Sequence, residues 1–136
     1  MDLAQTYSTT IAALGALAVF MLCQLLIADF VGIRAKHVPG SQVPSDHGNP
    51  LFRATRAVAN TNESIAIFLL AVFFCLLSGA SANATGYSAW TFVIARLLYA
   101  VCYYLNWQLP RSIMFGISLL ALAALLINGF SASLWS

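Results

Sequence analysis

The chain has 136 residues, of which 61% are hydrophobic and only 7% are charged, with a formal net charge of +2. A soluble domain carries roughly a quarter charged residues, so this composition excludes an ordinary soluble enzyme and indicates an integral membrane protein. The lysines and arginines are too few and too scattered to bind nucleic acid. The three cysteines lie singly in different apolar segments, a pattern that predicts neither a disulfide framework nor a metal site.

Four apolar segments are long enough to cross a hydrocarbon core, which takes roughly 20 helical residues. The first lacks the preceding basic region of a signal peptide, so we expect it to stay in the mature protein. The predicted fold is one all-α domain over residues 1–136, an antiparallel up-and-down bundle of four transmembrane helices. These helices are predicted at residues 9–33, 51–79, 87–106 and 111–130, with a cytoplasmic loop at residues 34–50.

The prolines and glycines at residues 34–50 rule out a continuous helix there. This segment is therefore predicted to be the longest loop of the chain. Asn49 followed by Pro50 is typical of a helix N-cap with proline at the first helical position, which predicts where the second helix begins. His37 and His47 lie in this loop without metal-ligand spacing, and we expect both to be ordinary loop residues.

Positive charges gather on one side of the predicted four-span arrangement, and the opposite connection and both termini carry none. By the positive-inside rule, the loop at residues 34–50 lies in the cytoplasm and both termini lie on the non-cytoplasmic side. The residues that carry these charges are Arg34, Lys36, Arg53, Arg56 and Arg111.

Two predicted helices carry polar stripes. Residues three or four apart share a helix face, so each stripe lies on one face of its helix. The stripe of the second helix consists of Arg53, Arg56, Asn60 and Glu63. The stripe of the third helix consists of Arg96, Tyr99 and Tyr103. Because a charge near the bilayer centre costs roughly 2.5 kcal/mol or more, such groups usually pair with one another and mark a functional site.

Glu63 and Arg96 lie at matching depth, about nine and ten residues from the cytoplasmic ends of their helices, or roughly 14 and 15 Å. Each is the only deeply placed charge of its sign, so we expect a structural ion pair between them. The rest of the two stripes would then line a polar cleft that opens to the cytoplasm. Arg111 and Ser112, at the start of the fourth helix, would stand at its mouth.

The chemistry of this cleft favours an anionic ligand with more than one carboxylate, because guanidinium groups bind carboxylates bidentately. Asn60 adds an amide, and the tyrosines add hydroxyl groups and stacking surface. Arg111 lies in the first turn of a helix, where it is placed to stabilise a developing negative charge such as a thiolate. Ser112 is placed to donate a hydrogen bond to the same group.

Each of these positions also has a purely structural explanation. As basic residues at a cytoplasmic helix end, Arg53, Arg56 and Arg111 can serve only to set the topology. Tyr99 and Tyr103 can be aromatic residues of the membrane interface, and the Glu63–Arg96 pair can serve only to align two helices.

Three blocks of this sequence resemble the MAPEG family, the membrane-associated proteins of eicosanoid and glutathione metabolism. The blocks are residues 53–63, residues 95–103 and the pair at residues 111–112. The similarity covers residues 50–116 in motif and the whole chain in layout. It implies a homotrimer of four-helix protomers in the lipid bilayer, with glutathione bound as co-substrate between neighbouring subunits.

The resemblance also implies roles for individual residues. Arg111 would stabilise the glutathione thiolate with Ser112 nearby, and Arg34 would contribute to the site of the adjacent subunit. The residues implied to bind glutathione are Arg53, Arg56, Asn60, Glu63, Tyr99 and Tyr103. The expected activity is that of a microsomal glutathione transferase or peroxidase, in which the thiolate attacks a lipophilic electrophile or hydroperoxide.

Two positions depart from the eicosanoid-making members of the family. Ser64 follows Glu63 where many of them have an aromatic residue or threonine, and Phe115 stands where some have tyrosine. We therefore expect a short bacterial-type member in an inner membrane, without a narrow eicosanoid specificity. Two alternatives remain open: a small four-helix transporter, which would need Glu63 to be free, and a non-catalytic relative that keeps the fold.

Overall fold

The computed structural model describes residues 2–135, and all of the regular secondary structure in that range is helical. This confirms the predicted all-α class. A short helix, α1, is followed by four long ones. Their bounds are α1 (Leu3–Thr6), α2 (Ser8–Arg34), α3 (Pro50–Leu77), α4 (Ala82–Tyr104) and α5 (Gln108–Trp135).

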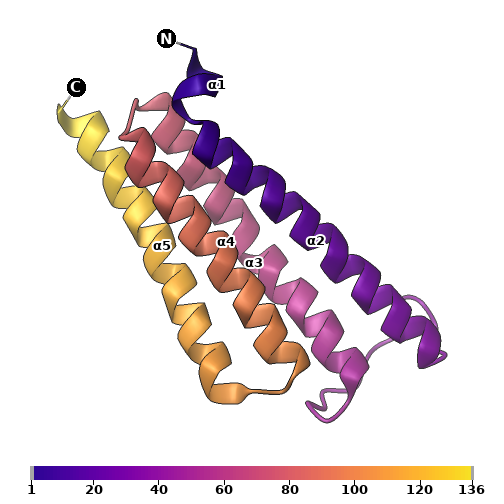
Figure 1. Ribbon diagram of the computed structural model, residues 1–136. Coiled ribbons are helices and arrows are strands. Elements are labelled where there is room, and N and C mark those ends of the chain that lie inside the picture. The colour runs from indigo at the N-terminus through magenta and orange to yellow at the C-terminus, as the bar shows by residue number, and fades with distance from the viewer. Residues whose placement is uncertain (1, 136) are drawn as a thin grey trace.

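The long helices are arranged around a central pair (Figure 1). α3 and α4 pack against each other, and each also packs against both α2 and α5. α2 and α5 lie on opposite sides of this pair, and the two termini lie at one end of the molecule (Figure 1). The opposite end, called the loop end below, carries the α2–α3 connection and the α4–α5 turn.

The N-terminus of α3 agrees with its sequence pattern. The Asn49 side chain accepts a hydrogen bond from the backbone N–H of Leu51, at 3.0 Å, and Pro50 is the first helical residue. This bond satisfies one of the free donors of the first turn. The predicted cap of the second helix is therefore confirmed.

The starts of α4 and α5 lie several residues earlier than predicted. α4 begins at Ala82 and not at residue 87, because Ser81 caps it by accepting a hydrogen bond from the N–H of Ala84, at 3.4 Å. α5 begins at Gln108 and not at residue 111. Proline is tolerated in the first turn of a helix, so Pro110 does not delay the start of α5.

Three of the described helices, α2, α3 and α5, are long and apolar enough to cross a membrane. α4 is not among them, so the fourth predicted span stays a prediction. Because α4 packs against all three other long helices, much of its polar surface faces protein and not the surroundings. Arg96, Thr85 and Tyr103 are all buried within this packing.

The core has two parts that differ in chemistry. The larger part lies towards the end that carries the termini and includes the stacked rings of Phe68 and Phe92, 4.3 Å apart. The smaller part lies towards the loop end and is built on Ala57, Tyr99 and Tyr103. The polar stripes of α3 and α4 therefore meet beside a small aromatic core.

Candidate functional site

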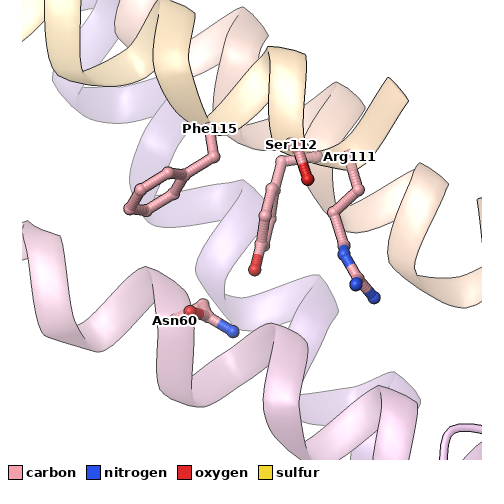
Figure 2. Close-up of a pocket in the computed structure, with 5 residues that line it drawn as sticks. Asn60, Arg111, Ser112 and Phe115 are labelled. Carbon is pink, nitrogen blue, oxygen red and sulfur yellow. The ribbon is translucent and has the colours of Figure 1, made fainter. Parts of the chain in front are cut away.

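Polar side chains from three helices line one pocket near the loop end. Its volume is about 260 Å³. Figure 2 shows Asn60 of α3 facing the Arg111 and Phe115 side chains of α5 across the pocket. The lining residues are Asn60, Tyr99, Arg111, Ser112 and Phe115. Four of these five are predicted site residues, and the structure brings them together from α3, α4 and α5.

Arg111 lines this pocket and carries one donor without a partner among the described residues. Its guanidinium carbon lies 4.5 Å from the ring centroid of Tyr103, which is a cation–π contact. Its Nη1 atom is buried and has no hydrogen-bond partner within residues 2–135. A buried donor without a partner is costly, so this atom favours an incoming acceptor.

Arg96 does not line the pocket and is 0% exposed. Its Nη2 atom donates a hydrogen bond to the backbone carbonyl of Asn60. Its guanidinium carbon lies 4.7 Å from the ring centroid of Tyr99 and 5.9 Å from that of Phe115. Arg96 thus supports two of the aromatic residues that line the pocket.

The predicted ion pair between Glu63 and Arg96 does not form in this chain. Among the described residues, the single ion pair within 4 Å joins Glu63 Oε1 to Arg56 Nη1, at 3.6 Å. The Glu63 and Arg56 side chains are 63% and 39% exposed, whereas Arg96 is enclosed. The correction has a geometric reason: equal depth does not make two helical residues face each other, because the rotation of each helix about its axis also matters.

The sequence profile of the MAPEG family matches residues 10–131, nearly the whole chain. The chain belongs to the MAPEG family. This membership confirms the resemblance of the three sequence blocks, and together with the apolar helices it indicates a membrane protein. The family includes glutathione transferases and peroxidases as well as other members. A search of curated proteins finds no match to this chain.

In this MAPEG protein, Arg53 holds the α2–α3 loop and does not line the pocket. Its Nη1 atom donates to the carbonyl of His47, at 2.6 Å, and its Nε atom donates to the carbonyl of Tyr104, at 3.2 Å. Arg34 also lies outside the pocket, exposed at the end of α2, with its guanidinium 5.6 Å from the Phe30 ring.

Tyr103 stands beside the pocket, with its ring 5.7 Å from that of Tyr99. Its hydroxyl group lies 3.4 Å from Nε2 of His47. The prediction that His47 is an ordinary loop residue therefore missed this contact. Nothing in the local sequence around His47 signals it, because the contact depends on how the loop folds back over α4. For Phe115, the sequence did indicate a place at the pocket, because Phe115 lies one helical turn beyond Arg111.

Proposed function

We propose that this MAPEG protein is a membrane enzyme of the microsomal glutathione transferase or peroxidase type. It binds glutathione beside Arg111 and activates its thiolate for attack on a lipophilic electrophile or hydroperoxide. The observation that carries the proposal is the convergence of Asn60, Tyr99, Arg111 and Ser112 on one pocket, in a chain of this family.

Arg111 has the chemistry that thiolate activation needs. Its unpaired Nη1 donor and its place in the first turn of α5 both favour a negative charge in the pocket. Ser112 Oγ donates to the carbonyl of Gln108, at 3.1 Å, and would turn from that carbonyl to the sulfur. Fixed donors aimed at a developing charge supply much of the catalysis in such sites.

The reaction proceeds in one of two ways, depending on the second substrate. With an electrophilic carbon, the thiolate forms a carbon–sulfur bond and the leaving group departs with its electron pair. With a hydroperoxide, the thiolate attacks the terminal oxygen and releases an alcohol, and a second glutathione converts the sulfenic acid to disulfide and water. Phe115 gives the pocket an apolar wall suited to a lipophilic substrate.

Two features support a site shared between subunits of a homotrimer. Ligand pockets usually measure about 300–1,000 Å³, so the roughly 260 Å³ offered by one chain would enclose only part of a tripeptide. Arg34 and the exposed side chain of Glu63 lie on the outside of the single chain, where a neighbouring subunit would meet them. Arg56 and Glu63 would then complete the glutathione site.

A second function has one observation in its favour. The Glu63 side chain is exposed on α3 and is paired only with the partly exposed Arg56 among the described residues. A small proton-coupled transporter would use such a reachable carboxylate. Proton-driven uptake of cationic compounds by reconstituted vesicles, lost in Glu63→Gln, would favour transport over glutathione chemistry.

Substitution of Arg111 tests the proposed enzyme. We expect Arg111→Ala to bind glutathione nearly as well as the wild type but to lose the ultraviolet absorbance of the bound thiolate, with kcat about a hundredfold lower. Arg111→Lys should recover part of the thiolate signal, because it restores the charge. Lys36→Gln removes an exposed cation at the same end of the molecule and is the matched control. Normal thiolate formation in Arg111→Ala would exclude this role.

A further inference from the structure

His47 occupies a defined position although it belongs to a loop. Its ring is stacked on that of Tyr103, with centroids 6.0 Å apart and planes inclined by 29°. It also makes a T-shaped contact with the Phe52 ring, with centroids 5.1 Å apart. Its Nε2 atom lies 3.4 Å from the Tyr103 hydroxyl oxygen. The side chain is therefore held by two aromatic rings and one polar contact.

The backbone around His47 is held as well. Arg53 of α3 donates to the His47 carbonyl at 2.6 Å and to the Tyr104 carbonyl of α4 at 3.2 Å, so one guanidinium group joins the loop to both helices. On the other side of His47, the Asp46 carboxylate accepts a hydrogen bond from the N–H of Gly48, at 2.8 Å. These bonds hold the backbone on both sides of His47.

Tyr103 connects His47 to the pocket. Besides His47, the Tyr103 ring contacts the Arg111 guanidinium, whose carbon lies 4.5 Å from the ring centroid, and the Tyr99 ring, whose centroid lies 5.7 Å away. Arg111 and Tyr99 both line the pocket. His47 is thus connected through a single side chain, that of Tyr103, to the residues proposed to bind the ligand.

We propose that His47 is a positioning residue that acts through Tyr103 by setting the direction of the hydrogen bond at the tyrosine hydroxyl. A neutral imidazole with a bare Nε2 accepts the Tyr103 proton, which leaves the hydroxyl oxygen to accept from the ligand. A protonated imidazole donates to the same oxygen, which frees the Tyr103 proton for a carboxylate or thiolate. This inference rests on the proposed function, because it takes the ligand in the pocket to be an anionic thiol.

The charges that face this contact come from several elements. Arg53 approaches from α3, Arg111 approaches the far side of Tyr103 from α5, and Asp46 is the neighbour in the loop. An anionic ligand beside Arg111 offsets one of the two cations. Glutathione binding and protonation of His47 therefore favour each other, so the affinity for glutathione is higher at lower pH.

The first test needs no glutathione. The chain has two histidines, so nitrogen-15 labelling of histidine gives two sets of imidazole signals, assigned by the loss of one set in His47→Gln. At a pH where the imidazole is neutral, we expect His47 to carry its proton on Nδ1, and Tyr103→Phe to abolish that preference. His37, whose ring lies near Ser41, should not respond. An unchanged His47 tautomer in Tyr103→Phe would overturn the inference.

The second test measures glutathione binding from pH 5.5 to 8. We expect His47→Ala to lower the affinity by up to about tenfold, the effect of one hydrogen bond, and to flatten its pH dependence. His47→Gln keeps an acceptor for Tyr103 and should retain the affinity at high pH but not the pH dependence. His37→Gln is the matched control and should behave like the wild type.

A double substitution separates an effect through Tyr103 from a general effect on the loop. In the Tyr103→Phe background, His47→Ala should cause no further loss of affinity, whereas additive losses would overturn the inference. If the wild-type protein binds no glutathione at all, the proposed function fails. The tautomer measurement then still decides whether His47 controls the Tyr103 hydrogen bond.

Discussion

Arg96 is the residue whose environment is least usual for its type. A fully buried guanidinium group normally has a carboxylate partner, yet no carboxylate lies within 4 Å of Arg96 in the described part of the chain. Its stabilising contacts are the Asn60 carbonyl and the faces of Tyr99 and Phe115. Two of its nitrogen atoms, Nε and Nη1, have no hydrogen-bond partner among these residues. Its planar shape therefore matters as much as its charge.

Substitutions at Arg96 should separate shape from charge. We expect Arg96→Lys to unfold at a lower temperature than Arg96→Met, because a buried ammonium group cannot stack on two rings and still reach the Asn60 carbonyl. The methionine side chain removes the buried charge and keeps most of the volume, so it should be nearly neutral. Thermal unfolding in detergent measures both. A lysine variant as stable as the wild type would mean that charge alone holds this position.

At the scale of elements, α2, α3 and α4 end in the same way. In each, the second residue beyond the C-cap donates its N–H to a carbonyl five residues earlier, as His37 does to Gly32, Ala80 to Cys75 and Trp107 to Cys102. The residue between adopts a positive φ of 52° at Lys36, 64° at Gly79 and 59° at Asn106. These turns stop the helices abruptly and allow the chain to reverse.

Gly79 tests this arrangement. A Cβ at Gly79 would meet nothing within 4 Å, so the cost of Gly79→Ala comes from the positive φ alone. We expect a loss of about 1–2 kcal/mol in the free energy of unfolding. Gly15, within α2, also has open space around it but an ordinary helical conformation, and Gly15→Ala should stabilise slightly. Chemical denaturation of the two variants should therefore give opposite signs, and equal signs would contradict the explanation.

At the scale of the whole molecule, the single chain leaves a carboxylate on an apolar surface. Glu63 is exposed on α3, and exposed apolar neighbours such as Ile67 and Leu70 follow it along the helix. An exposed carboxylate within an apolar span is unfavourable in lipid. We therefore expect the Glu63 side chain to meet a neighbouring subunit of a homotrimer.

The native mass of the detergent-solubilised protein tests this expectation. It should equal three chains of 14.6 kDa each. Glu63→Leu should lower the trimer fraction, because it removes the polar partner of the neighbouring subunit, whereas Asn62→Leu, a similar change at the next exposed position, should not. A monomeric wild type would contradict the expectation, and a more stable Glu63→Leu trimer would place Glu63 towards lipid.

The sequence predicted the candidate site in part. Helical spacing predicted that Asn60 and Tyr99 line one cleft, and the start of the fourth helix placed Arg111 and Ser112 at its mouth. The ion pair predicted for Arg96 was wrong, and the hydrogen bonds of Arg53 and the contact of His47 with Tyr103 were missed. Each depends on contacts across 36 or more positions of the chain or on the path of a loop, which local spacing does not report.

The sequence by itself determined the helical class, the cap of α3, the stripes on α3 and α4, and the membership of the MAPEG family. These follow from local periodicity, turn chemistry and motif, all of which depend on residues close together in the chain. Only the tertiary structure decided that Arg96 bonds to Asn60, that Glu63 turns to Arg56, and that His47 rests on Tyr103. The rotation of each helix about its axis and the course of the loop are set by packing between distant segments.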